Sequence, residues 1–409
     1  MSNFITSIHI NQIFHLKDLD IVLSENKRQH LLLTGRNGSG KTSLMNAIME
    51  FIETVYTDKN CEFLDYESHL QNTKQSLETQ KDNGDKKAIV KYEGYVKNWE
   101  KMVNSVYGKV KVSFSDITRL AKDIDEGRFI VAYYNDRRWP NFVEHDQPRK
   151  PDMDLKNIKT SKVDQFLDLL THYQLQTAFA QLKDNEKRVS SIGKWFAGIE
   201  KIFQRLFEDP QLHLDFDSDN YKFYFVTKGK RFKFTELSAG YSAALDIISD
   251  LIFKMQSTDK LVDVYDKEGV VLIDEVETHL HLELQRQILP LLTSVFPNIQ
   301  FVVSTHSPFV LSSIKDAVAY DMERHEVIGD LTDYSYEALA EGYFGVKTNS
   351  VEIEVRLERL EELLKQGNAL NLAEKDELKR LRADFENLSE LVAPSMKGKY
   401  YEISRKYQQ

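Results

Sequence analysis

One segment near the N-terminus has the residue types and spacing of a phosphate-binding loop. Residues 35–42, GRNGSGKT, fit the pattern G-x-x-x-x-G-K-[ST] at every fixed position. Glycines allow backbone N–H groups to wrap a phosphate chain at the start of a helix, where the helix dipole also favours negative charge. We expect Lys41 to reach the β- and γ-phosphates, and the Thr42 hydroxyl to hold Mg²⁺. The predicted nucleotide-phosphate-binding residues share this one loop: Gly35, Asn37, Gly38, Ser39, Gly40, Lys41, Thr42 and Ser43.

The surroundings of this loop distinguish a phosphate site from a glycine-rich turn without a ligand. The apolar run HLLLT (30–34) precedes the loop and is typical of a buried strand in a parallel or mixed sheet. A helical pattern follows the loop directly. A strand, a glycine-rich loop and a helix in this order favour the phosphate site.

A second group of candidate residues consists of two carboxylates at the end of a strand. Four apolar residues, 270–273, are followed by Asp274 and Glu275. In α/β folds the carboxyl ends of the strands form the edge at which ligands bind. We expect Asp274 to hold Mg²⁺ through water, and Glu275 to orient or deprotonate the water that attacks the phosphate. Acidic residues end many strands, so this interpretation depends on the upstream phosphate loop.

Two further segments place polar residues at helix and strand ends. Ser238, Ala239 and Gly240 precede a helical pattern, where a serine hydroxyl and backbone N–H groups can form a second phosphate-binding surface. The alternative for Ser238 is an ordinary helix N-cap. His306 follows the apolar strand pattern of residues 301–303, and a lone histidine in such a place is also found as a plain surface or core residue.

These four motifs, in this order, resemble those of the ABC-ATPase superfamily. The segments ELSAGY (236–241), LIDEVETHLH (272–281) and STHSP (304–308) are most similar to its SMC-like and OLD-like branch, which includes ATPase subunits of Septu, PARIS and retron anti-phage systems. The resemblance implies that Ser238, Ala239 and Gly240 close over the γ-phosphate held by another subunit's phosphate loop, so that the sites form in a homodimer or larger oligomer. It also implies that His306 senses the γ-phosphate and belongs to the catalytic group with Lys41 and Glu275.

The sequence departs from the family pattern at several positions. Ala239 replaces the middle glycine of the signature segment, and Tyr241 its last residue. After the strand pattern RFIVAYY (128–134), no glutamine stands where the family often has one, so no residue is assigned to that loop. His281 stands where the loop that crosses the dimer interface usually has Asp. The HLH run at 279–281 suggests metal ligation, but the sequence offers no matched third or fourth ligand.

The order of the patterns predicts an α/β fold, a P-loop ABC-ATPase head with a mixed or parallel core sheet, an antiparallel β-subdomain and helical insertions. We expect the ATPase domain to span residues 1–325. Within it, polar helices at 57–107 form an inserted arm, residues 136–207 form a second helical insertion, and residues 210–235 form a β-meander that leads into the signature segment. Residues 326–409 form a C-terminal helical region, which either binds a partner or packs as a hairpin on its own domain.

Composition limits the class of protein. No stretch approaches 18 consecutive apolar residues, and the N-terminus lacks the pattern of a secretory signal, so we expect no membrane segment and a cytoplasmic location. The one cysteine cannot form an internal disulfide, which agrees with a reducing compartment. A formal net charge of −10 argues against a dedicated DNA-coating role. Two interpretations are open for four basic residues: they line a local DNA groove, or they are solvated loop charges. These residues are Arg137, Arg138, Arg149 and Lys150.

Three functions are compatible with these motifs. The first is a regulatory anti-phage ATPase that binds and hydrolyses ATP with Mg²⁺, and controls a separate effector, such as a nuclease or toxin, in response to DNA or a phage protein. Because residues 326–409 contain no D-x-D pair, we expect no fused Toprim nuclease. The second is an SMC-like DNA-repair or chromosome-maintenance ATPase, although the 57–107 arm spans only roughly 40 Å as a helical hairpin. The third is a transporter ATP-binding subunit, which the missing glutamine and the HLH run disfavour.

Overall fold

The structure is a computed structural model of the chain. It describes residues 2–58, 60–138, 142–153, 160–256, 265–329, 331–332, 334, 336–342, 351–388 and 394–407. The chain divides into two compact units, Met1–Asp333 and Tyr334–Gln409. The first unit contains all the sequence motifs described above.

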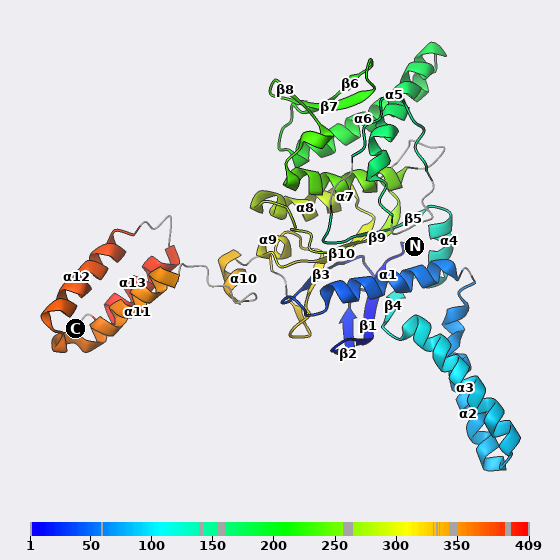
Figure 1. The fold of residues 1–409 in the computed structure, drawn as a ribbon, viewed down its shortest axis with the longest axis horizontal. Helices are drawn as coiled ribbons and strands as arrows, with labels where there is room; N and C mark the ends of the chain where they lie inside the picture. The colour runs from blue at the N-terminus through cyan, green and yellow to red at the C-terminus, as the bar shows by residue number, and fades with distance from the viewer. Residues whose placement is uncertain are drawn as a thin grey trace. The chain divides into compact units, whose positions relative to one another are not determined.

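A six-stranded sheet forms the centre of the first unit (Figure 1). Its order is β12-β11-β3-β10-β9-β5, and every neighbouring pair is parallel except β11 and β12. The strands are β3 (His30–Thr34), β5 (Phe129–Tyr134), β9 (Glu268–Ile273), β10 (Ile299–Ser304), β11 (Ala317–Asp321) and β12 (Glu326–Ile328). The central strands β3, β9 and β10 are almost entirely buried, as expected of parallel strands covered on both faces. The predicted mixed core sheet of an α/β fold is therefore confirmed.

Different elements cover the two faces of this sheet (Figure 1). Alternate residues of the central strands, such as Leu31, Val270 and Val302, share one buried cluster with helix α1 and with the antiparallel sheet β2-β1-β4. The intervening residues point to the opposite face. On that face the Tyr134 hydroxyl of β5 donates a hydrogen bond to Asp250 of helix α7. The elements named here are β1 (Ile5–Ile13), β2 (Leu16–Val22), β4 (Val110–Phe114), α1 (Lys41–Thr57), α7 (Ala239–Met255) and α8 (Leu282–Val295), which follows β9.

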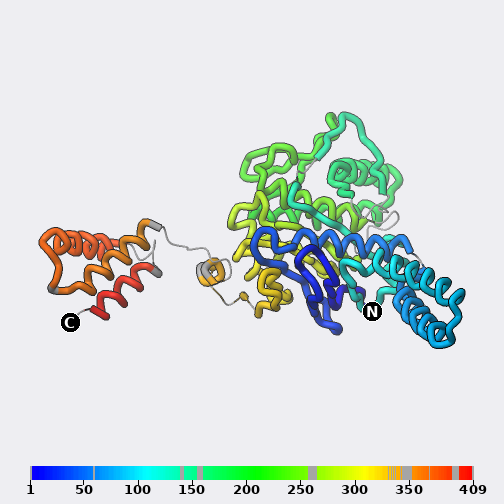
Figure 2. The backbone as a smooth tube through the Cα atoms, turned by 60° about the horizontal axis from the view of Figure 1, so that its bottom comes forward, coloured from blue at the N-terminus to red at the C-terminus, as the bar shows by residue number. Residues whose placement is uncertain are grey.

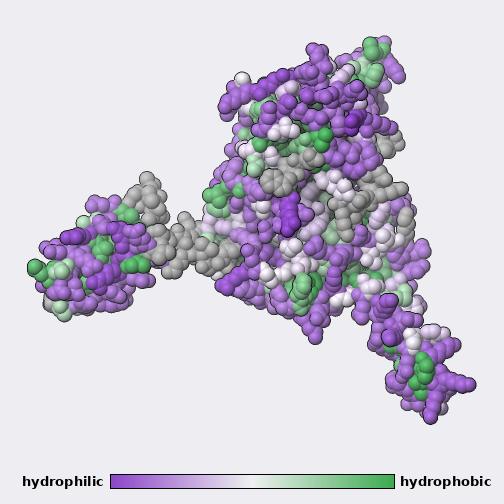
Figure 3. All heavy atoms as spheres, in the orientation of Figure 1, coloured by the Kyte–Doolittle hydropathy of each residue, from purple (hydrophilic) through white to green (hydrophobic). Residues whose placement is uncertain are grey.

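After α1 the chain forms a pair of antiparallel helices that lie side by side (Figures 1 and 2). The Trp99 ring of the second helix stacks on the His69 ring of the first, with ring centroids 4.8 Å apart. Figure 3 shows a largely hydrophilic surface on this pair, which suits helices exposed to solvent on most sides. The helices are η1 (Glu62–Asp65), α2 (Tyr66–Asn83) and α3 (Lys86–Tyr107).

Between β5 and α7 the chain forms a second helical pair and a small sheet. The sheet, of order β6-β7-β8, is antiparallel throughout and leads directly into α7, so the predicted antiparallel β-subdomain is confirmed. The elements are η2 (Val163–Gln165), α5 (Phe166–Leu182), α6 (Glu186–Leu206), β6 (His213–Asp217), β7 (Lys222–Thr227), β8 (Lys230–Lys233) and η3 (Phe234–Glu236).

One helix of the first unit was not predicted from the sequence, and one domain boundary differs from the expected one. A helix, α4 (Ile117–Asp125), begins soon after β4, because the Asp116 side chain accepts a hydrogen bond from the Arg119 backbone and caps it. The expected end of the ATPase domain at residue 325 falls before β12. Because β12 pairs with β11, the first unit extends to Asp333. The short helix α9 (Pro308–Leu311) follows β10.

The second unit is helical and has its own hydrophobic core. Leucines of α11 and α12 pack with Phe385 and Tyr400, whose rings stack at a centroid distance of 5.6 Å. Its helices are α10 (Tyr336–Gly342), α11 (Val351–Gln366), η4 (Gly367–Ala369), α12 (Leu372–Glu386) and α13 (Pro394–Lys406). In the described ranges of the whole chain, no helix combines the length and apolar character needed to cross a bilayer.

Candidate nucleotide site

The phosphate loop connects the end of β3 to the start of α1. Gly35, Gly38 and Gly40 all have positive φ angles, 129°, 83° and 99°, which L-residues with a side chain rarely adopt. At Gly40 a Cβ atom would also lie 2.7 Å from the side chain of Leu16. The loop therefore requires glycine both for its backbone conformation and for its close approach to β2.

Lys41 is buried at the start of α1 and folds back over the loop. Its Nζ donates hydrogen bonds to the carbonyl oxygens of Gly35 (2.8 Å) and Arg36 (3.2 Å). Burial lowers the pKa of Lys41, and the carboxylates of Glu275 and then Asp274 oppose that shift. The structure therefore brings the predicted lysine and both predicted carboxylates into one electrostatic environment.

Asp274 follows β9 and is fully buried. Because β9 and β10 are parallel and in register, Asp274 and Ser304 end up side by side, and the Ser304 hydroxyl donates a hydrogen bond to Asp274 Oδ1. Among the described residues, Asp274 Oδ2 has no hydrogen-bond partner. A buried carboxylate oxygen without a partner is costly unless a ligand completes it. Asp274 and the exposed Thr42 hydroxyl offer the oxygen donors that Mg²⁺ prefers, so the residues present fit this ion.

Glu275 occupies a strained turn immediately after Asp274. Its φ angle is 46°, in the left-handed region that a residue with a side chain seldom occupies. Its backbone N–H donates to the Ser304 hydroxyl at 2.8 Å, and its side chain Oε2 accepts from the Thr278 hydroxyl at 3.3 Å. The half-buried carboxylate is thus directed by local contacts rather than by a regular strand.

His306 lies just beyond the end of β10. Within the described part of the chain, its buried Nε2 atom has no hydrogen-bond partner. Burial, followed by the positive charge of Lys41, lowers the pKa of His306, and Glu277 and Glu275 oppose that shift. His306 therefore lies within electrostatic reach of the lysine and the carboxylates, as a neutral imidazole at neutral pH.

Glu277 holds the His306 segment against the end of β9. Its two carboxylate oxygens accept hydrogen bonds from the His306 backbone N–H (2.5 Å) and the Thr305 hydroxyl (2.7 Å). Neither Glu277 nor Ser304 was predicted as a site residue from the sequence. Ser304 could have been predicted, because it is a polar residue at the end of an apolar strand, next to the strand that carries Asp274. For Glu277, spacing alone offered no signal.

The predicted signature residues form the N-terminus of α7, apart from the phosphate loop of the same chain. Ser238 occupies the N-cap position without a side-chain capping bond, and both Ser238 and Ala239 are exposed. Gly240 is buried against His279, where an added Cβ would lie 3.1 Å from the carbonyl oxygen. Across the described ranges, no hydrogen bond or ion pair joins residues 238–240 to residues 35–43.

The HLH run serves the structure of α8. His281 is the N-cap residue, and its Nδ1 accepts a hydrogen bond from the Leu284 backbone at 3.4 Å. Its ring also meets the Tyr241 ring edge-on, at 5.7 Å between centroids. In the part of the chain that the structure describes, no group of three or more His, Cys, Asp or Glu side chains is arranged to hold a metal ion.

The Arg138 side chain is buried, contrary to both interpretations of it from the sequence. Both earlier interpretations, a DNA groove and a solvated loop charge, require an exposed side chain, whereas Arg138 is only 4% exposed. Its guanidinium donates to the carbonyl oxygens of Asp274 and Glu275, each at 2.8 Å. Arg137, the preceding residue, is exposed. The two interpretations are therefore wrong for Arg138.

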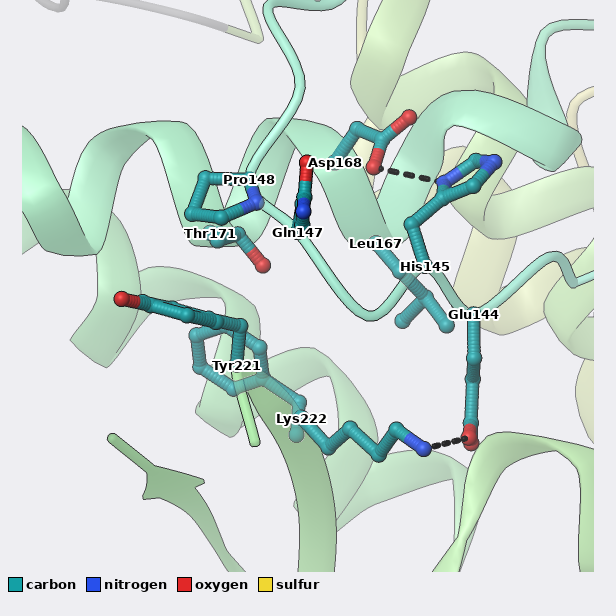
Figure 4. Close-up of a pocket in the computed structure, with 10 residues that line it drawn as sticks. Glu144, His145, Gln147, Pro148, Leu167, Asp168, Thr171, Tyr221 and Lys222 are labelled. Atoms are coloured by element: carbon teal, nitrogen blue, oxygen red, sulfur yellow. Dashed lines mark hydrogen bonds and ion pairs between the residues drawn. The ribbon is translucent and has the colours of Figure 1, made fainter. Parts of the chain in front are cut away.

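A small pocket between α5 and β7 contains a His–Asp pair (Figure 4). The His145 Nδ1 atom lies 3.0 Å from Asp168 Oδ1, an arrangement that can orient a catalytic histidine. The volume of the pocket is about 10 Å³, which admits a single water molecule. Figure 4 shows the other ring nitrogen of His145 turned away from the pocket. This pair is therefore a structural contact outside the nucleotide site.

Comparisons with known proteins were made for the whole chain. It is 27% identical over 216 residues to the Septu protein PtuA of Bacillus mycoides (strain KBAB4), with 51% of this chain and 30% of that protein covered. It is 33% identical over 116 residues to the Retron Vc95 probable ATPase of Vibrio cholerae, with 28% and 21% covered. The chain thus spans less than a third of the length of these two relatives. The predicted resemblance to ATPases of anti-phage systems is confirmed.

Among solved structures, the SmcHead bound to the C-winged helix domain of ScpA overlaps 80% of this chain and 97% of that chain, at 10% identity and a TM-score of 0.40. A family match covers residues 31–312, which include the phosphate loop, both carboxylates and His306. The family is described as “AAA domain, putative AbiEii toxin, Type IV TA system”. Because this match covers more than half of the sequence, the chain belongs to this AAA-domain family of ATPases.

Proposed function

We propose that the chain binds ATP with Mg²⁺ and hydrolyses it at a site completed by a second copy. The observation that carries the proposal is the buried Asp274 Oδ2 atom without a partner, beside a lysine and a second carboxylate. An unsatisfied anionic oxygen of this kind suits a cation-bound triphosphate.

Each residue has a separate task in this reaction. Lys41 exchanges its two backbone carbonyl partners for phosphate oxygens, and the loop N–H groups surround the phosphate chain. Thr42 and Asp274 would hold Mg²⁺, which would neutralise phosphate charge. Glu275 orients the attacking water or accepts its proton, and the Nε2 atom of His306 meets the γ-phosphate.

We further propose that this ATPase controls a separate effector in an anti-phage defence system, in response to DNA or a phage protein. The support is the similarity to a Septu protein and to a retron ATPase. A phage challenge of cells carrying the chain with its neighbouring genes tests this proposal. Protection that requires an intact Lys41 supports it, and equal survival with and without the chain contradicts it.

A substitution at the exposed tip of α7 tests the shared site. We expect Ser238→Arg to leave ATP binding to one subunit intact and to lower hydrolysis roughly tenfold or more, because the larger side chain obstructs the partner's phosphate chain. Hydrolysis rates and the ATP-dependent mass in solution are measured together. Ser190→Arg is the control, since Ser190 is an exposed serine elsewhere, on α6. Unchanged turnover in Ser238→Arg would argue that each chain works alone.

A further inference from the structure

Arg138 connects the segment after β5 to the turn that carries the two carboxylates. Its Nη1 donates to the Asp274 carbonyl and its Nη2 to the Glu275 carbonyl, both at 2.8 Å. The planar guanidinium presents these donors in a fixed fork, so it fixes the relative orientation of two successive peptide groups.

The backbone that Arg138 contacts is strained. A residue with a side chain at a φ angle of 46° costs on the order of 1–3 kcal/mol, and it persists only where its surroundings hold it. At Glu275 the N–H donates to the Ser304 hydroxyl, and the C=O accepts from both Arg138 and the Thr278 backbone N–H. Both polar groups of this residue are therefore clamped by side chains from other strands or loops. These backbone contacts, together with the Thr278 hydroxyl that donates to the carboxylate itself, set the direction of the Glu275 side chain.

Arg138 also lies within electrostatic reach of helix α7. The carboxylate of Asp246 is close enough to oppose the effect of burial, which lowers the pKa of Arg138. Burial raises the pKa of Asp246 to about 6, so this carboxylate is ionised at neutral pH. Four residues before Arg138, the Tyr134 hydroxyl donates to Asp250 of the same helix at 2.6 Å. Arg138 is thus hydrogen-bonded to the Asp274–Glu275 turn and feels the charge of α7, and among the described residues its buried Nε atom has no hydrogen-bond partner.

We propose that Arg138 is a positioning residue, which aims the Glu275 carboxylate at the attacking water by holding its backbone in the left-handed conformation. This inference rests on the proposed function, in which Glu275 acts on that water. Arg138 itself touches neither ATP nor water in this scheme. It acts through the two carbonyl groups alone.

The test compares Arg138→Met with Arg137→Met in the full chain. Methionine keeps much of the apolar stem of the side chain but removes both donors, and Arg137 is the adjacent, exposed arginine. We expect Arg138→Met to lower kcat by about 10²-fold, as for a misplaced catalytic group, while the Kd for ATP stays within a few-fold. Arg137→Met keeps the wild-type kcat. Thermal unfolding of each variant reports whether it folds.

A second variant covers the case in which Arg138→Met does not fold. Arg138→Lys keeps the positive charge beside Asp246 but lacks the fork, so we expect a folded chain with kcat reduced at least about tenfold. Wild-type kcat in a folded Arg138→Met or Arg138→Lys chain would overturn the proposal.

Combining Arg138→Met with Glu275→Gln separates positioning from a general structural effect. If Arg138 acts through Glu275, the double variant is no slower than Glu275→Gln alone, because the group to be aimed is already absent. If Arg138→Met lowers the kcat of the Glu275→Gln variant by the same factor as it lowers the wild-type kcat, the positioning role is contradicted. If instead Glu275→Gln hydrolyses ATP at the wild-type rate, the proposed role of Glu275 is contradicted. That result is distinguishable from one in which only the positioning role of Arg138 is contradicted.

Discussion

Replacing Lys41 with alanine is expected to abolish ATP binding in practice. The lysine can offer the β- and γ-phosphates two charge-assisted hydrogen bonds, each worth about 1.5–3 kcal/mol, so their loss weakens binding by roughly 10²–10⁴-fold. Equilibrium binding of a fluorescent ATP analogue measures the effect. Lys122→Ala is the matched control, because Lys122 is an exposed lysine on α4. Wild-type affinity in Lys41→Ala would show that the nucleotide site lies elsewhere.

The second large effect is expected at Glu275. Glu275→Gln preserves the size of the side chain and removes the base, so it should retain ATP affinity and lower the hydrolysis rate by about 10²–10⁴-fold. Because hydrolysis no longer opens the ATP-bound oligomer, this oligomer should accumulate. Size-exclusion chromatography with ATP detects it. Glu186→Gln, at an exposed glutamate of α6, serves as the control. Normal turnover in Glu275→Gln assigns the base to another residue.

Local patterns predicted most residues of the candidate nucleotide site. The phosphate loop is contiguous, so its glycines, Lys41 and Thr42 were visible in one short segment. The carboxylates and His306 each follow an apolar strand, and parallel strands bring such ends to one edge of the sheet. The central sheet and the antiparallel sheet were predictable for the same reason, because their strands have a clear apolar pattern.

The contacts that hold these residues were not predictable from spacing. Arg138 lies 136 residues before Asp274 in the sequence, and nothing in its own segment distinguishes it from the exposed Arg137. Glu277 accepts hydrogen bonds from a backbone N–H and a hydroxyl that lie 29 and 28 residues away, respectively. Such contacts depend on how loops from different strands pack, and an arginine or glutamate in a polar loop has no sequence pattern that reveals its burial.

The role of residues 238–240 stays a prediction for a different reason. These residues were predicted to act on the nucleotide of another subunit, and a single chain holds only half of such a site. Their exposure, and the absence of a capping bond at Ser238, leave the hydroxyl available for a ligand. Solution assembly with ATP is therefore the measurement on which this part of the site depends.

The two hydrogen bonds from Lys41 to its own loop have a consequence for how ligands enter. These internal hydrogen bonds hold the loop in its curved conformation, so a ligand does not have to order a flexible segment when it binds. In the proposed binding step, the Lys41 ammonium group exchanges two neutral carbonyl acceptors for anionic phosphate oxygens. In the proposed site, a nucleoside without phosphates has no anionic oxygen to replace these carbonyl acceptors, so we expect Lys41 to favour ligands that carry phosphate groups.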